Sequence, residues 1–441
     1  MLLPATNALS RDVGSRAIQR ISVRILPFVF LLYIVSYLDR ANVAFAKLTM
    51  SRDLGFSEAV FGLGAGLFFL GYLALEIPGA IIVERWSARW WISRILITWG
   101  LCTILVGFVR TSTEFYIARS LLGAAEAGFF PGIIVYLAHW FPQEYRARAL
   151  GKFVLAIPLS LLLGAPISGL LLGVNWLGLA GWRWVFIIEG LPAVLLGFAT
   201  FVYLVDRPSQ AKWLPAEERD WLENELARER NAKTAGARHT AWRGLRDGRA
   251  YLLAFGLCFA NIGVVGFILW LPTTIQQASG LPAGPSAALS ALPFLCGMIG
   301  VWICSRSSDR KSERLLHTTL PMLACGVLFG MTALPGQPFP VKLLLLSLSG
   351  GAMFAWAPSF WVLPTLTLGE SAAAAAIGLI NSVGNLGGFV GPFVVGRLLT
   401  DNRPFAEAVC FLSACFAVGA VLTFWGGRRS PAVAAMTLEL E

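Results

Sequence analysis

Charged side chains are scarce in this sequence: only 14% of its 441 residues are Asp, Glu, Lys or Arg, and 56% are hydrophobic. Soluble globular domains carry about 25% charged residues, so the composition excludes an ordinary soluble protein. The mean hydropathy of +0.69 points the same way. We therefore expect an integral membrane protein that has the lipid bilayer as its surroundings.

Histidine is also rare, with only His139, His239 and His317, all in or beside predicted loops. The sequence contains no Walker A loop, no G-x-S-x-G turn and no HExxH motif. These patterns bind nucleotide phosphates, present a nucleophilic serine or hold a catalytic zinc ion. We therefore expect neither an enzyme nor a bound cofactor.

Cysteine pairs with metal-binding spacing are absent. The seven cysteines all fall in predicted membrane spans, with no CxxC and no nearby His at ligand spacing. Such isolated residues are typical of free thiols that fill space. We expect no metal site.

Long hydrophobic runs make up most of the chain. Runs of roughly 18 to 28 apolar residues alternate with short polar breaks, and about 20 residues of α-helix cross the hydrocarbon core. Backbone groups inside lipid must bond within their own segment, so each run is predicted to be a helix. Counting gives twelve spans, at 25–45, 58–83, 91–110, 114–138, 149–173, 182–205, 250–276, 285–304, 315–334, 341–363, 371–399 and 404–426.

Basic residues outnumber acidic ones, 35 to 25, for a formal net charge of +10. With a cytoplasmic N-terminus, segments on that side of the membrane hold 26 of the 35 basic residues and the opposite side holds seven. Cytoplasmic loops concentrate Lys and Arg, so the excess indicates orientation and not nucleic-acid binding. We expect both termini in the cytoplasm and a multi-pass protein of the plasma membrane, the inner membrane in a bacterium.

The two halves of the chain show signs of an internal repeat. Glu84 and Arg85 recur as Asp309 and Arg310 at an offset of 225, and the Pro at 166 recurs at 392. Such repeats place a substrate site at their interface near the bilayer midplane. We predict an all-α fold of two pseudo-symmetric six-helix bundles. The predicted divisions are a cytoplasmic tail at 1–24, bundles at 25–205 and 250–426, a cytoplasmic linker at 206–249 with a surface helix over 215–230, and a cytoplasmic tail at 427–441.

Four ionisable residues stand out in two predicted spans: Asp39 and Arg40 in the first, Arg119 and Glu126 in the fourth. A charge at the bilayer centre costs roughly 2.5–3.5 kcal/mol on insertion scales and marks a functional path by default. Seven residues of helix turn about 700°, so Arg119 and Glu126 share one face. We interpret the four as the working centre of a transporter.

Neutral candidates surround this centre. Tyr33 and Tyr37 share a helical face with Arg40, because the three are spaced i, i+4, i+7. Spans of the second half contain no basic residue near their middle, so we expect them to contact the neutral part of a substrate. Their polar and amphipathic candidates are Asn261, Trp270, Trp356, Ser359, Trp361, Glu370, Asn381, Ser382 and Asn385.

Two further acids are ambiguous. Glu76 fits either an acid bonded within the bundle, which we favour, or a second proton site. Glu189 fits pairing with Arg183 or another structural role better than proton coupling.

Several motifs together resemble the major facilitator superfamily, and more narrowly its anion:cation symporter family, almost from end to end. They are YLDRAN at 37–42, the loop motif at 84–89 with its echo at 309–314, the Arg119/Glu126 pair, WRWVFIIEG at 182–190 and GNLGGFVGP at 384–392. That family includes bacterial permeases for tartrate, sugar acids and aromatic acids.

The resemblance implies proton-coupled uptake of an organic anion by alternating access. It places Arg40 and Arg119 near the substrate, Asp39 and Glu126 in proton coupling, and Tyr37 and Asn385 in substrate contact. It also implies that Glu84, Arg85, Arg89, Asp309 and Arg310 act in conformational gating.

The sequence therefore predicts a monomeric symporter whose partners are a small organic carboxylate and protons. Export by exchange and a sensor that binds without transport stay open as alternatives, as does the identity of the anion.

Overall fold

The computed structural model describes residues 3–233, 246–368, 370–401 and 403–428, and these ranges contain helices and no β-strand. The first half holds α1 (Leu3–Leu54), α2 (Glu58–Arg85), α3 (Ala88–Val106), α4 (Ser112–Glu126), α5 (Phe129–Ala138), α6 (Gln143–Val154), α7 (Ala156–Leu172), α8 (Gly181–Tyr203) and α9 (Ala216–Lys233). The second holds α11 (Gly248–Ser279), α12 (Ala283–Leu289), α13 (Ala291–Lys311), α14 (Leu315–Met331), α15 (Phe339–Ala355), α16 (Ala357–Phe360), α17 (Leu363–Leu368), α18 (Glu370–Thr400) and α19 (Phe405–Gly427).

The helices account for all twelve predicted spans. Ten helical runs in the described ranges are long and apolar enough to cross a membrane, and the shorter apolar helices α7 and α14 match the other two spans. The fourth span is divided into α4 and α5 because Gly128 adopts a φ of 84°. Glycine takes this left-handed conformation without strain. The break follows directly after Glu126 and places that carboxylate at the end of α4.

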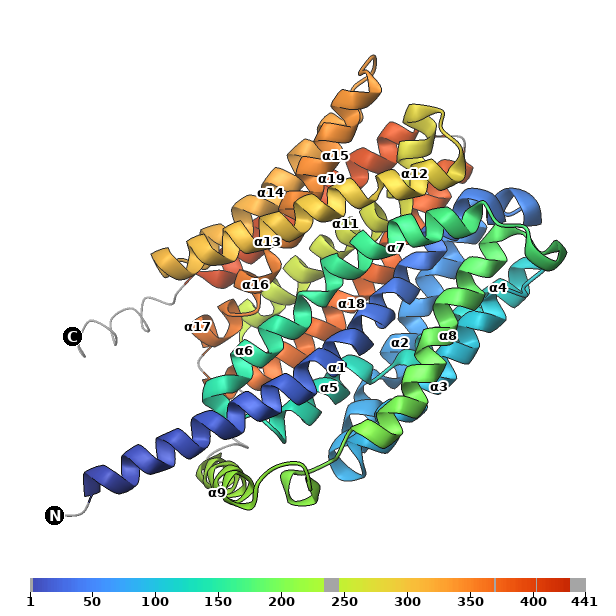
Figure 1. Cartoon of the computed structure of the whole chain (residues 1–441). Coiled ribbons are helices and arrows are strands. Elements are labelled where there is room, and N and C mark those ends of the chain that lie inside the picture. Colours follow the sequence, from blue (N-terminus) through green and yellow to red (C-terminus); the bar gives the residue numbers. More distant parts are fainter. Residues whose placement is uncertain (1–2, 234–245, 369, 402, 429–441) are drawn as a thin grey trace.

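The first helix is longer than the sequence predicted. Residues 3–24, predicted as a polar tail, continue α1, and its far end extends beyond the predicted limit of 45 to Leu54. The early part packs on the linker helix α9, where Arg20 Nε lies 3.1 Å from Glu218 Oε1. Figure 1 shows this extension beside α9. The helix expected over 215–230 is therefore docked against α1.

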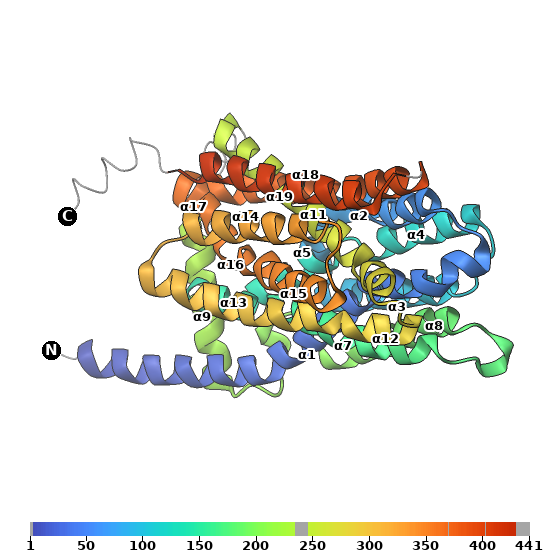
Figure 2. The same cartoon turned by 90° about the horizontal axis from the view of Figure 1, so that it is seen from above.

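The helices form two groups that follow the halves of the chain (Figures 1 and 2). In the first group α3 packs on α8, α2 on α4 and α1 on α7; in the second, α11 packs on α18 and α19, and α13 on α15. Contacts between the groups run from α2 to α18, from α7 to α12 and α13, and from α1 to α11.

The two groups are tied together at one end of the bundle, where α1 ends and α2 begins, which we call the distal end. Lys47 Nζ of α1 lies 2.7 Å from Glu58 Oε2, and Trp270 of α11 donates its indole N–H to the same oxygen at 3.1 Å. The amide of Ala59 donates to Thr400 Oγ1 of α18 at 2.7 Å. Lys47 is buried in this cluster, although the sequence placed it beyond the first span. The distal end is therefore closed.

Backbone packing between α2 and α18 strengthens this closure. A Cβ at Gly62 would overlap the carbonyl oxygen of Pro392 and lie 2.9 Å from Cα of Gly396. Both obstacles are backbone atoms, which no rotamer change can move away. Small residues at such positions let helix backbones approach closely.

We predict that Gly62→Val lowers the thermal midpoint of the purified protein, because the valine forces α2 away from α18. Overpacking of this kind costs about 1–3 kcal/mol. The matched control is Gly378→Val, on the same helix as Pro392 but with no neighbouring heavy atom within 4 Å of its added Cβ. Thermal unfolding in detergent measures both, and equal midpoints for the two variants would contradict the packing role.

Candidate functional site

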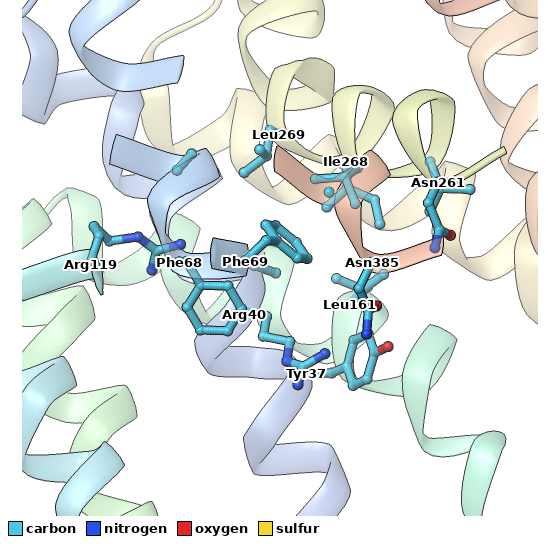
Figure 3. Close-up of a pocket in the computed structure, with 15 residues that line it drawn as sticks. Tyr37, Arg40, Phe68, Phe69, Arg119, Leu161, Asn261, Ile268, Leu269 and Asn385 are labelled. Atoms are coloured by element: carbon cyan, nitrogen blue, oxygen red, sulfur yellow. The ribbon is translucent and has the colours of Figure 1, made fainter. Parts of the chain in front are cut away.

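A cavity of about 130 Å³ lies between the two groups of helices. An apolar cavity of roughly 150 Å³ holds a benzene-sized molecule, so this one suits a small organic ligand. The residues that line it are Tyr37, Arg40, Ala41, Ala65, Phe68, Phe69, Arg119, Leu161, Asn261, Val264, Val265, Ile268, Leu269, Asn385 and Gly388. Figure 3 shows both guanidinium groups extending from the first half, with the asparagines on the other side.

An ion pair joins α1 to α4 at the cavity wall. Arg40 Nε lies 2.7 Å from Glu126 Oε1, and Ser36 donates to the same oxygen at 2.8 Å. The other carboxylate oxygen, Oε2, and Arg40 Nη2 are buried without a hydrogen-bond partner in the described structure. Both members of the pair thus keep unused bonding capacity.

Arg119 differs from Arg40 because it has no carboxylate within ion-pair distance among the described residues. Its side chain is 2% exposed, and its Nε and Nη1 atoms are buried without a hydrogen-bond partner. The ring of Phe68, 5.0 Å from Arg119 Cζ, supplies cation–π attraction. A buried cation with open donors beside a cavity is a site for an anion.

Asp39 lies next to this centre but not in the cavity wall. It accepts hydrogen bonds from Asn42 Nδ2 at 2.7 Å, from the indole of Trp99 and from the hydroxyl of Thr103. Three donors compensate its charge, so in this conformation the side chain holds α1 against α3.

The two candidate tyrosines take different positions, and only one of them lines the cavity. Tyr37 lines the cavity, and its ring lies 5.1 Å from Arg40 Cζ. Tyr33 is buried behind it, edge-on to Tyr37 at 5.0 Å and stacked on Phe153 at 4.0 Å. Tyr33 therefore supports Tyr37 from outside the cavity.

Asparagines of the second half meet a carboxylate of the first. Asn381 Nδ2 donates to Glu76 Oε1 at 2.7 Å, and Asn385 Nδ2 lies 3.3 Å from Oε2. Asn385 lines the cavity and Asn381 does not. We expected Glu76 to bond within its own bundle, but its partners belong to the opposite one.

The candidates from span ten lie outside the cavity wall. Ser359 bonds to Ser308 Oγ at 3.1 Å, and Trp356 is buried edge-on against Phe360. Trp361 is 36% exposed. The span is divided into α15, α16 and α17, and none of these three side chains lies in the cavity wall.

The gating candidates occupy the opposite end from the distal contacts. Asp309 pairs with Arg314 at 2.6 Å, while Arg310 is exposed. The guanidinium of Arg89 lies 5.0 Å from the ring of Phe201, and its backbone N–H donates to Asp206. The side chains of Glu84, Arg85 and Glu370 lie outside the described residues.

Glu189 does not pair with Arg183. It accepts from Ser168 Oγ at 2.6 Å, whereas Arg183 donates to the carbonyl of Gly107 at 2.7 Å. Arg183 bonds to this carbonyl near the start of α8, whereas Glu189, six residues further along the helix, bonds to Ser168 of α7. The partner of Glu189 in the structure is therefore Ser168 and not Arg183.

The sequence did not indicate that an aromatic ring lies beside both guanidinium groups of the site. Phe68 lies 5.6 Å from Arg40 Cζ and 5.0 Å from Arg119 Cζ, so its ring contacts both guanidinium groups. One Phe among the 30 of this chain gives no signal of such a role. In the described residues, no three His, Cys, Asp or Glu side chains gather as a metal site.

Comparison with known proteins identifies the family. The family model "Major Facilitator Superfamily" matches residues 29–392, more than half of the chain. The chain belongs to the major facilitator superfamily. It is therefore a membrane transporter and not an enzyme, and the predicted superfamily and fold class are confirmed.

Similar proteins agree with this assignment. A "Putative tartrate transporter" of Agrobacterium vitis is 42% identical over 427 residues, covering 96% of this chain and 94% of that protein. A "Quinolone resistance transporter" of Acinetobacter baumannii is 39% identical, covering 94% and 95%. A bacterial homologue of the human lysosomal transporter Spinster, solved inward-facing and unoccupied, shares the fold with a TM-score of 0.72 at 17% identity, covering 92% of this chain and 98% of that one.

The two guanidinium groups should respond oppositely to removal in the ligand-free protein. Arg119→Met should raise the thermal midpoint, because it removes a buried charge that lacks an ion-pair partner. Arg40→Met should lower it, because it leaves Glu126 without its cation, at a cost of roughly 3 kcal/mol. Thermal unfolding of both purified variants tests this contrast, and equal destabilisation by the two would show that Arg119 is already compensated.

Proposed function

We propose that this transporter takes up a small organic carboxylate together with protons, by alternating access. The single observation that carries the proposal is the buried Arg119 guanidinium, which faces the cavity without a carboxylate partner. A substrate carboxylate at this position forms charge-assisted, bidentate hydrogen bonds that a neutral ligand does not form. The tartrate transporter among the relatives supports an acid substrate.

Glu126 is the acid that we place in proton exchange. Its ion-pair partner Arg40 also lines the cavity, so an incoming anion competes with Glu126 for that guanidinium. When the anion takes hold of Arg40, Glu126 loses its cation, and a proton compensates its charge. Loss of the anion reverses the sequence and releases the proton.

Asp39 is the second proposed proton site. It lies near enough to Glu126 and Arg119 for electrostatic interaction, but its three hydrogen-bond donors must rearrange before it takes up a proton. Glu126 therefore acts first. We assign substrate contact to Tyr37 and Asn385 in the cavity wall, and to Arg40 and Arg119 at its charged side.

The orientation of the protein in the membrane determines which side the cavity faces and how the membrane potential acts on uptake. We place both termini in the cytoplasm of a bacterial cell, and in that orientation the closed distal end faces outward. A membrane potential of 100 mV opposes the entry of one negative charge by about 2.3 kcal/mol. One proton per monoanion cancels this cost, and two protons make the potential drive uptake.

Glu126→Gln should abolish accumulation driven by a proton gradient but retain exchange of internal for external substrate, because glutamine keeps a hydrogen-bonding oxygen and cannot take up or release a proton. Uptake and counterflow of radiolabelled tartrate in proteoliposomes measure the two activities. Glu189→Gln, a buried acid away from the cavity, is the control and should keep both. Gradient-driven accumulation by Glu126→Gln would remove Glu126 from the mechanism.

Export by exchange is the second candidate, favoured by the likeness to a quinolone resistance transporter. The direction of proton movement separates the two. Tartrate added outside vesicles without a gradient should make the medium more alkaline if protons enter with it, and more acidic if they leave in exchange. A sensor would bind tartrate and show no counterflow.

A further inference from the structure

Glu76 is a buried carboxylate that the coupling mechanism does not use. It is 5% exposed, and no Lys, Arg or His of the described structure lies within ion-pair distance. Its partners are the amides of Asn381 at 2.7 Å and Asn385 at 3.3 and 3.5 Å, both on α18. A carboxylate of the first half thus holds two side chains of the second.

This contact fixes which way the Asn385 amide points. An ionised carboxylate accepts hydrogen bonds and cannot donate them, so the NH₂ group of Asn385 must face Glu76. The carbonyl oxygen of the amide is then turned away from Glu76. No described group donates to this oxygen, and Asn385 lines the cavity.

Asn261 is held in the same way by a different acceptor. Its Nδ2 donates to the backbone carbonyl of Gly384 at 3.0 Å, and a backbone carbonyl also accepts only. The carbonyl oxygen of Asn261 likewise has no donor in the described chain, and the residue lines the cavity. The wall contributed by the second half therefore offers two hydrogen-bond acceptors. Glu76 and the backbone carbonyl of Gly384 fix their orientation by accepting from the NH₂ groups of the two amides.

The two walls of the cavity favour different chemical groups, which the two ends of one ligand can supply. Guanidinium groups bind a carboxylate, whereas amide oxygens need a donor such as a hydroxyl group. A ligand without donors would cover these oxygens and leave them unpaired, which weakens binding by roughly 10- to 100-fold. A hydroxylated carboxylate satisfies both walls.

We propose that Glu76 is a positioning residue that orients the Asn385 amide and thereby makes the site selective for hydroxylated carboxylates over carboxylates of the same carbon skeleton without hydroxyl groups. This selectivity rests on the proposed function, because the carboxylate end is assigned to the guanidinium side. Glu76 acts through Asn385 and need not touch the ligand.

The wild-type protein gives the first test, with no variant required. Calorimetric titration in lipid nanodiscs compares L-tartrate with succinate and D-glycerate with propionate, pairs that differ by two hydroxyl groups. The hydroxylated member of at least one pair should bind roughly 10- to 100-fold more tightly. Equal binding of both members overturns the selectivity and leaves the carboxylate site standing. If none of the four acids binds, the proposed function fails, and this inference fails with it.

Glu76→Gln tests the positioning role. Glutamine donates as well as accepts, so Asn385 is free to turn its NH₂ group toward the cavity. The tartrate-to-succinate affinity ratio should fall at least fivefold, through weaker tartrate binding. A purely structural role would weaken both acids equally and leave the ratio unchanged, which would overturn the proposal.

Asn385→Leu supplies a second, independent variant. It removes the acceptor itself and should lower the ratio to a similar extent, and adding Glu76→Gln should lower it no further, since Glu76 acts through Asn385. If the two substitutions lower the affinity ratio additively in the double variant, Glu76 does not act through Asn385. Glu189→Gln, whose carboxylate bonds to Ser168 away from the cavity, is the matched control and should keep the wild-type ratio.

Discussion

An ionised side chain inside an apolar bundle is stable only where another group compensates its charge. The described structure meets this constraint in two ways around the site. Arg40 and Lys47 are paired with Glu126 and Glu58, and Asp39 receives three hydrogen-bond donors. The Arg119 guanidinium is the exception, since it borders the cavity without an ion-pair partner in the described residues. The helix contacts around the site follow from these pairings, because each joins α1 to a different neighbour.

The interface between the halves combines two kinds of contact with different consequences. Backbone packing at Gly62 and the hydrogen bond from Trp270 of α11 to Glu58 of α2 hold the distal end shut. The contacts of Glu76 with α18 lie nearer the cavity and are made of polar atoms only. Hydrogen bonds depend on direction, so the hydrogen bonding in this part of the cavity wall depends on the orientation of α18.

The two sides of the cavity are chemically unlike, and this asymmetry follows from which half supplies each wall. The first half contributes guanidinium groups and aromatic rings, and the second contributes amides held by acceptors. A ligand that bridges them links the halves at mid-membrane. In the proposed transport cycle, recognition and the relative movement of the halves would therefore depend on the same atoms.

The sequence by itself determined the membrane class and the twelve spans, because apolar run length is a local property. It also singled out Arg40, Arg119 and Glu126 as candidates, because a charge inside an apolar run is costly. It did not determine that Asp39 is enclosed by Trp99 and Thr103, that Lys47 is buried, or that Glu76 meets α18, because those partners lie far away along the chain. The sequence equally did not determine that Trp356 and Ser359 lie outside the cavity wall. Only the tertiary structure brought helices of both halves together and so decided which polar groups are compensated and which remain open to a ligand.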